Sequence, residues 1–224
     1  MRLLLLPNVA GEGGLRAEPK RAPLGPWIGK LGSMAVDLGA LLESSGAILR
    51  GHFLLTSGRH SEVYFEKFRI LEQPHVLSAL CTEIASHYAD QGIELIAGPT
   101  TGGIIIDFEV ARQMGLPSCY IETENGVKTL RRNKSIPAGV KTLIVDDVLT
   151  TGTSLFESRA AIESHGGEVV AYGVLIDRAA PGIDFGVPLY GAYKVEAESF
   201  HPDEVPDWLA AIPITKPGTR NIVG

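Results

Sequence analysis

Residues 142–154 read Thr-Leu-Ile-Val-Asp-Asp-Val-Leu-Thr-Thr-Gly-Thr-Ser, and this stretch says more about the fold than any other. Its first four residues are apolar or β-branched, which predicts a short buried strand. Two carboxylates, Asp146 and Asp147, follow where that strand is expected to end. Beyond a run of small hydroxyl residues, positions 155–165 have the apolar spacing of a helix. The stretch therefore predicts a strand, a loop and a helix, with two acids at the strand tip.

The loop of this unit suits an anion. Backbone N–H groups in such a loop, together with the positive end of the helix that follows, bind anions. The residues that we expect at a phosphate are Thr150, Thr151, Gly152, Thr153 and Ser154. The neighbouring carboxylates would repel a phosphate, but they can accept hydrogen bonds from a sugar diol or bind a phosphate-bound magnesium ion. Phosphate, diol and metal together describe a phosphorylated ribose.

Two other nucleotide-binding patterns are missing from the sequence. No G-x-G-x-x-G follows a strand, and G-x-x-x-x-G-K-[ST] does not occur. A polar turn without function would explain the hydroxyl residues, but not two adjacent acids. The 13-residue stretch resembles the phosphoribosyl pyrophosphate signature of type I phosphoribosyltransferases. That resemblance implies phosphoribosyl pyrophosphate as substrate and Mg²⁺ as cofactor, held mainly by the substrate and also within reach of Asp146 and Asp147.

A second loop of the same kind lies upstream. An apolar strand is predicted at 93–98, and a helix begins directly after the small residues that follow it. Such residues let backbone N–H groups approach a ligand closely. In the resembled family this loop holds the pyrophosphate. The residues concerned are Pro99, Thr100, Thr101, Gly102 and Gly103.

Predicted helices and strands alternate along the chain. The helices are expected at 35–45, 75–91, 103–114, 153–165 and 203–211, and the strands at 93–98, 117–122, 141–146, 168–176 and 188–195. Strands separated by helices of this length indicate an α/β fold with a parallel sheet. Ligands bind such sheets at the carboxyl ends of the strands, where both loops are expected to lie. The resemblance implies the type I phosphoribosyltransferase fold, a twisted parallel sheet flanked by helices, with a small hood from the terminal segments.

Composition predicts one domain, at 34–224. The chain has 224 residues, 45% of them hydrophobic, which is enough for one sizeable core. Residues 1–33 differ: they hold scattered prolines and five basic residues against two acidic ones, whereas the whole chain carries −6. We interpret them as a disordered extension or as sequence upstream of a start at Met34. The acidic body argues against a nucleic-acid partner.

The cysteines and the hydropathy pattern predict a cytoplasmic protein. Cys81 and Cys119 lie in apolar stretches without metal-ligand spacing, so we expect buried, reduced thiols. No segment has the roughly 18 apolar residues that a membrane-spanning helix requires. We therefore expect no membrane partner.

Residues 51–71 resemble the amino-terminal segment of orotate phosphoribosyltransferases, with Phe-x-Leu-x-Ser-Gly in a hairpin that opens the hood over the base. Residues 216–220, Lys-Pro-Gly-Thr-Arg, resemble the ending of some bacterial members. The similarity thus extends far beyond the phosphate motif. It implies that Tyr64 and Phe65 line the base pocket, although both could equally be core residues of the hairpin.

The sequence departs from this family at three places. Members usually carry an arginine for the orotate carboxylate where this chain has Phe156, and many carry a lysine at the position of Gly102. Phenylalanine cannot pair with a carboxylate. The basic residues of the mobile catalytic loop are shifted towards its carboxyl side. If orotate is the acceptor, another cation must bind its carboxylate, and the candidates are Arg159, Arg50 and Lys67.

The chemistry needs cations near the leaving pyrophosphate. Displacement at the anomeric carbon has an oxocarbenium-like transition state, and the leaving group gathers negative charge. The basic residues expected on the loop at 124–134 are Lys128, Arg131, Arg132 and Lys134. The resemblance implies that this loop reaches into a neighbouring subunit's site, and hence a homodimer.

The sequence therefore predicts a phosphoribosyltransferase acting on a pyrimidine base, with orotate first. The products would be orotidine 5′-monophosphate and pyrophosphate, in the synthesis of UMP. Two alternatives stay open: transfer to another base, and a non-catalytic regulator that senses phosphoribosyl pyrophosphate. A regulator would be expected to carry a nucleic-acid-binding module, and the sequence offers no helix-turn-helix pattern for one.

Overall fold

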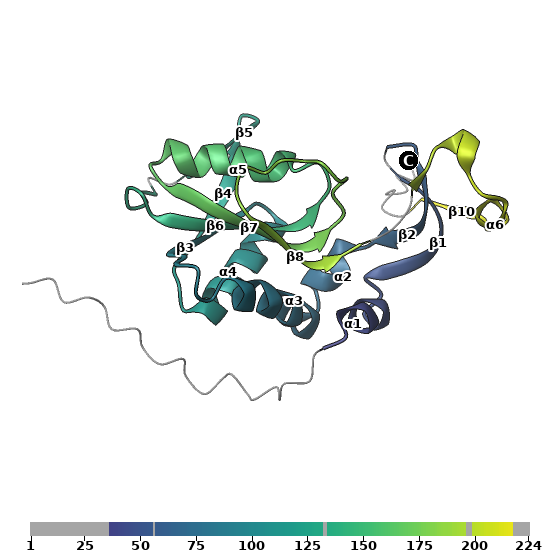
Figure 1. The fold of residues 1–224 in the computed structure, drawn as a ribbon, viewed down its shortest axis with the longest axis horizontal. Coiled ribbons are helices and arrows are strands. Elements are labelled where there is room, and N and C mark those ends of the chain that lie inside the picture. Colours follow the sequence, from purple (N-terminus) through teal and green to yellow (C-terminus); the bar gives the residue numbers. More distant parts are fainter. Residues whose placement is uncertain (1–35, 56, 132–133, 196–198, 217–224) are drawn as a thin grey trace, which may run out of the picture. The chain divides into compact units, whose positions relative to one another are not determined.

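The computed structural model describes residues 36–55, 57–131, 134–195 and 199–216, which fall within one compact unit spanning Ser33–Gly224 (Figure 1). The interpretation of residues 1–33, and most of the resemblance at 216–220, concern positions outside the described residues. Within the described parts, no helix is long and apolar enough to cross a membrane.

A six-stranded sheet with the order β5-β4-β3-β6-β7-β8 forms the centre. All neighbours in it run parallel except β5, which pairs antiparallel with β4. The strands are β3 (Leu95–Pro99), β4 (Ser118–Glu124), β5 (Val127–Thr129), β6 (Lys141–Leu149), β7 (Glu168–Asp177) and β8 (Leu189–Lys194). This is the α/β architecture expected from the alternating pattern.

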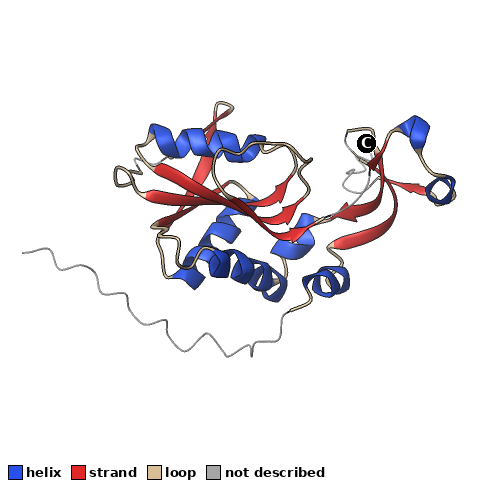
Figure 2. Cartoon of the chain, in the orientation of Figure 1, coloured by secondary structure: helices blue, strands red, loops and turns tan. Residues whose placement is uncertain are grey.

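Helices cover both faces of the sheet (Figures 1 and 2). Helices α3 (Pro74–His87) and α4 (Gly102–Met114) lie on one face, and α5 (Thr153–Ser164) lies on the other. Each face has its own apolar core. Leu80 and Ile84 of α3 and Ile106 of α4 pack into one, and Leu155 and Ile162 of α5 pack into the other. Burial on both faces explains why the central strands are nearly continuous apolar runs.

The hood is a second sheet, built from both ends of the described chain. Its strands have the order β10-β1-β2-β9. They are β1 (Ile48–Leu54), β2 (His60–Phe65), β9 (Ser199–Phe200) and β10 (Ile214–Thr215). The short helices near it are α1 (Leu38–Ser44), α2 (Lys67–Leu71), the 3-10 turn η1 (Pro202–Glu204) and α6 (Asp207–Ala210). Buried His52 ties the two ends together, since its Nδ1 lies 3.0 Å from the carbonyl oxygen of Ile212 and its Nε2 lies 2.5 Å from His60 Nδ1.

Three predicted elements need correction. The strand expected at 141–146 continues to Leu149, so the two acids lie inside β6 rather than at its tip. The segment expected as a loop at 124–134 begins as a β-hairpin, with β5 pairing back on β4 around Asn125 and Gly126. The helix expected at 203–211 is a 3-10 turn followed by one short helical turn. The prediction of buried, unpaired Cys81 and Cys119 is confirmed.

Candidate functional site: a phosphate loop, a second anion loop and an acidic strand

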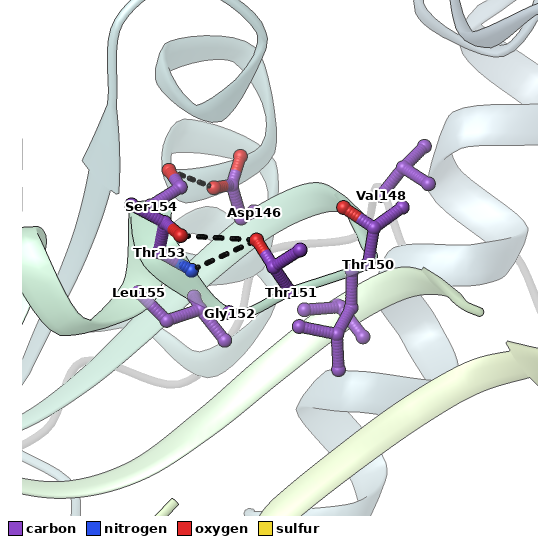
Figure 3. Close-up of a pocket in the computed structure, with 10 residues that line it drawn as sticks. Asp146, Val148, Thr150, Thr151, Gly152, Thr153, Ser154 and Leu155 are labelled. Carbon is purple, nitrogen blue, oxygen red and sulfur yellow. Dashed lines mark hydrogen bonds between the residues drawn. The ribbon is translucent and has the colours of Figure 1, made fainter. Parts of the chain in front are cut away.

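The loop between β6 and α5 forms a cavity of about 130 Å³, several times the space that one water molecule needs (Figure 3). Its lining is Asp146, Val148, Leu149, Thr150, Thr151, Gly152, Thr153, Ser154, Leu155 and Val174. Gly152 caps α5 in a left-handed conformation with φ of +80°, which favours glycine. The N-cap residue makes no side-chain hydrogen bond to the helix, and the Thr153 N–H donates to Thr151 Oγ1 only at a long 3.5 Å, so the start of α5 remains open to a ligand. The five residues expected around a phosphate therefore lie together.

The hydroxyl groups of this loop differ in their partners and orientation. Thr151 Oγ1 and Thr153 Oγ1 lie 3.0 Å apart at the exposed mouth of the cavity (Figure 3). The Ser154 hydroxyl donates instead to Asp146 Oδ2 at 2.6 Å. Ser154 thus offers a phosphate its backbone N–H, while its side chain positions the acid.

Asp146 lies on the α5 face of β6. The carboxylate is buried, accepts from Ser154, and also accepts from the backbone N–H of Asp147 at 2.8 Å. Burial raises the pKa of this carboxyl group above its ordinary value, and the Ser154 hydrogen bond partly opposes that rise. A hydrogen-bonding sugar hydroxyl is a suitable further partner for such a group.

Asp147 lies on the opposite face of the strand, because neighbouring residues of a strand alternate. Its Oδ2 accepts from Lys67 Nζ at 2.8 Å. A Cβ at Gly102 would lie 2.5 Å from the same oxygen. A side chain at this position would therefore require the Asp147 carboxylate to move, and Lys67 of α2 already brings a cation to the place. The two acids do not face one ligand from a strand tip, as the sequence suggested, but flank β6.

The second anion loop connects β3 with α4. Its glycines are tightly packed: a Cβ at Gly98 would lie 2.2 Å from the Gly103 carbonyl oxygen, and one at Gly103 would lie 2.7 Å from the Pro99 ring carbon Cδ. The Thr100–Thr101 peptide bond is cis. Thr101 caps α4 without a side-chain hydrogen bond, so this helix too begins with N–H groups that no capping side chain occupies. Because β3 and β6 are adjacent and parallel, the two loops share one edge of the sheet.

Lys128 lies beside the phosphate loop of its own chain. From β5 its Nζ donates to the carbonyl oxygen of Ser154 at 2.9 Å and to the Ser154 hydroxyl oxygen at 2.6 Å. Burial lowers the pKa of Lys128, while Asp146 and Glu157 oppose that change. Lys128 thus holds the first turn of α5 and is not a free loop cation.

The other predicted cations are scattered. An Arg131 guanidinium nitrogen lies 3.4 Å from a carboxylate oxygen of Glu124. Arg132 lies outside the described residues. Lys134 donates to the carbonyl oxygen of Ser118 at 3.2 Å and lies 5.7 Å from the centre of the Tyr120 ring. The described residues therefore bring Lys128 to the phosphate loop but not Arg131 or Lys134.

The residues expected around the base fall into two groups. Phe156 stacks on Phe185 with ring centres 5.5 Å apart, and both rings lie close to Gly152 of the phosphate loop. Phe65 is buried in the core beneath the hood, and half-buried Tyr64 contacts the ring of Phe53. The sequence reasoning missed Arg178, whose guanidinium carbon lies 5.6 Å from the centre of the Phe65 ring.

Comparison with known proteins agrees with this geometry. Residues 69–184 match the family model described as "Phosphoribosyl transferase domain". The orotate phosphoribosyltransferase of Pelotomaculum thermopropionicum is 43% identical over 186 residues, which cover 83% of this chain and 98% of that protein. The orotate phosphoribosyltransferase of Desulforamulus reducens is 42% identical over 81% of this chain and 95% of its own length.

A solved structure supports the same relationship. The orotate phosphoribosyltransferase from Aeropyrum pernix superposes with a TM-score of 0.61 and 28% identity, covering 71% of this chain and 94% of that one. The likeness to the Pelotomaculum enzyme extends over nearly all of that protein. This chain belongs to the orotate phosphoribosyltransferase family.

Proposed function

We infer that the protein transfers the phosphoribosyl group of phosphoribosyl pyrophosphate to orotate, giving orotidine 5′-monophosphate and pyrophosphate in the synthesis of UMP. The observation that carries this inference is the pair of helix N-termini without a capping side chain, those of α4 and α5, which follow the adjacent parallel strands β3 and β6. Asp146 and Asp147 lie on β6. Two anion sites separated by acids match a sugar that carries a phosphate at one end and a pyrophosphate at the other.

The chain's residues act by positioning and by charge. The bond from the anomeric carbon to the pyrophosphate oxygen breaks with its electrons leaving on oxygen, and a ring nitrogen of the base forms the new bond. Backbone N–H groups at the start of α4 would stabilise the charge that gathers on the leaving group. The α5 loop would hold the 5′-phosphate, and Asp146 would orient the ribose hydroxyls.

Mg²⁺ is proposed as the cofactor. Asp146 and Asp147 offer oxygen donors, the ligands that this ion prefers. In the described part of the chain no cluster of three or more His, Cys, Asp or Glu could hold a metal ion by itself, so the substrate would supply most ligands. When bound, the ion would neutralise pyrophosphate charge.

We also propose a homodimer and a cytoplasmic location. The homodimer, with the 124–134 segment near a neighbouring site, is what the family resemblance implies, and exposed Arg131, which pairs with Glu124 in its own chain, would have to leave that partner to reach the site. A cytoplasmic location fits the two buried, unpaired thiols.

A steady-state assay of the purified chain with phosphoribosyl pyrophosphate, Mg²⁺ and a panel of bases tests the function. We expect orotate to be used with a kcat/KM at least about a hundredfold above that for uracil, since a site built for a polar group discriminates strongly against its absence. Preference for another base would contradict orotate as acceptor. Binding of phosphoribosyl pyrophosphate without turnover of any base would favour the sensor.

A further inference from the structure

Each cation that the sequence nominated for the orotate carboxylate already has a carboxylate partner. Arg50 donates to Glu43 Oε1 at 2.6 Å, and Arg159 donates to Glu163 Oε1 at 2.7 Å. Lys67 donates to Asp147 Oδ2 at 2.8 Å. A substrate carboxylate would have to displace one of these acids, so none of the three is a ready-made site.

Arg178 differs from all three. It follows directly after β7, and within the described parts of the chain its guanidinium forms no ion pair and donates no side-chain hydrogen bond. The side chain is half-buried, and its guanidinium carbon lies 5.6 Å from the centre of the Phe65 ring. Burial lowers the pKa of Arg178, and the nearby Tyr64 opposes that change. A cation withdrawn from water without a counter-charge is costly unless a ligand supplies the charge.

The backbone places this cation between the two ends of the site. The Arg178 N–H donates to the carbonyl oxygen of Leu149 at 2.9 Å. Leu149 is the last residue of β6, immediately before the phosphate loop, while Phe65 and Tyr64 belong to the hood strand β2. Arg178 therefore lies at the carboxyl edge of the sheet, with its backbone beside the phosphate loop and its side chain at the hood.

We propose that Arg178 binds the carboxylate of orotate and sets the choice of acceptor base, in place of the arginine that Phe156 replaces. This inference rests on the proposed function. A guanidinium can form two parallel hydrogen bonds with a carboxylate, and contact with the Phe65 ring restricts its orientation. A carboxylate-free base would leave Arg178 without its partner, which disfavours uracil.

The test compares Arg178→Gln, Arg178→Lys and the control Arg112→Gln with the wild-type chain. Arg112 is an exposed arginine of α4 paired with Glu109 and has no part in the site. For each protein, kcat/KM is measured for orotate and for uracil, KM for phosphoribosyl pyrophosphate, and melting temperature. We expect Arg178→Gln to lose about ten- to a hundredfold in kcat/KM for orotate. Its kcat/KM for uracil and its KM for phosphoribosyl pyrophosphate should stay within about threefold.

Arg178→Lys keeps the charge but not the paired donors, so an intermediate loss for orotate is expected, and this variant carries the test should the glutamine variant not fold. The control should match wild type. An equal loss for both bases would mean that Arg178 only supports packing on Phe65, and no loss for orotate would also overturn the proposal. Wild-type protein that turns over no orotate would instead defeat the proposed function itself.

Discussion

The phosphate end and the base end of the site are built in different ways. At the phosphate end, two loops each join a strand to the helix that follows it, and the groups proposed to bind the ligand are mainly backbone N–H groups. At the base end, Phe65 of β2 meets Arg178, more than a hundred residues further along the chain. One end is local in sequence and relies on the main chain, whereas the other is assembled from distant side chains.

This difference separates reactivity from specificity. Backbone donors bind any suitably placed phosphate, so the phosphate end can serve many acceptors. The base end must select one base, and a single partly buried cation can determine that selectivity. Changes at the two ends should therefore alter different kinetic parameters.

The largest effect is expected from Asp146→Asn combined with Asp147→Asn. Each substitution removes a charge-assisted contact on β6, and together they should lower kcat/KM for transfer by about a thousandfold. The check is a steady-state assay beside a melting curve. The adjacent exposed acids Asp203 and Glu204, changed in the same way, provide the control. Near-normal activity would contradict the assignment of the two acids to the ribose. An unfolded variant would show that the two acids are needed for the fold instead.

Gly102→Ala should have the next largest effect. Its new Cβ would lie 2.5 Å from Asp147 Oδ2, so the carboxylate must move away from Lys67. Displacements of this size cost up to about a hundredfold in rate, and we expect a ten- to hundredfold loss in kcat/KM for phosphoribosyl pyrophosphate. Gly51→Ala, whose Cβ would meet only the Phe53 ring at 3.3 Å, is the control in the hood. Equal losses in both variants would show that the loss at Gly102 does not come from its place beside Asp147 in the pyrophosphate loop.

The phosphate end was largely predictable from sequence because its parts are contiguous. A buried strand, small residues and an amphipathic helix can be recognised within about a dozen residues. The predicted strands and helices of the central sheet are present, with β6 longer than expected and β5 added. The opposite orientations of Asp146 and Asp147 could not be predicted, because the extension of β6 to Leu149 depends on pairing with β7.

The base end was only partly predictable. The hood hairpin followed from resemblance, but the pairing of Arg50 and Arg159 with nearby acids follows from side-chain positions that a sequence does not fix. Arg178 carried a usable signal, since it lies just beyond the parallel strand predicted at 168–176 and so at the ligand edge of the sheet. The reasoning that selected residues 99–103, which follow the strand predicted at 93–98, applies to it as well.

Asp107, on the helix that follows the second anion loop, gives the stability of the fold a pH dependence. This acid of α4 is buried, its Oδ2 has no hydrogen-bond partner among the described residues, and burial raises its pKa to about 7. In the unfolded chain its pKa is near 3.9. The folded form therefore keeps a proton that the unfolded form has lost, and stability falls as pH rises from about 4 to about 7.

The Asp107→Asn variant has no titratable group at this position, so it should lack this dependence of stability on pH. Melting temperatures of both proteins from pH 5 to pH 8 provide the measurement. We expect wild type to fall by several degrees more than the variant over that range, equivalent to a few kcal/mol, roughly 1.4 kcal/mol for each pKa unit. Parallel curves would mean that Asp107 is charged in the folded protein throughout.

The smallest effect is expected from Phe156→Arg. The ring at this position stacks on Phe185 beside Gly152 and is 39% exposed. If Arg178 already binds the carboxylate, a second arginine here should change kcat/KM for orotate by less than about threefold and lower the melting temperature slightly through lost stacking. A tenfold gain for orotate would show that the carboxylate had lacked a partner, and would move the base end to α5.

The separation of the two ends is tested most directly by titrating phosphoribosyl pyrophosphate with Mg²⁺ into three proteins in a calorimeter. These are the wild-type chain, the Arg178→Gln variant and the Asp146→Asn/Asp147→Asn variant. Loss of two charge-assisted contacts should weaken the Kd of the acid variant by about a hundredfold or more. We expect the Kd of Arg178→Gln to stay within about twofold of wild type. Equal weakening in both variants would contradict the account, because it would place Arg178 at the phosphate end.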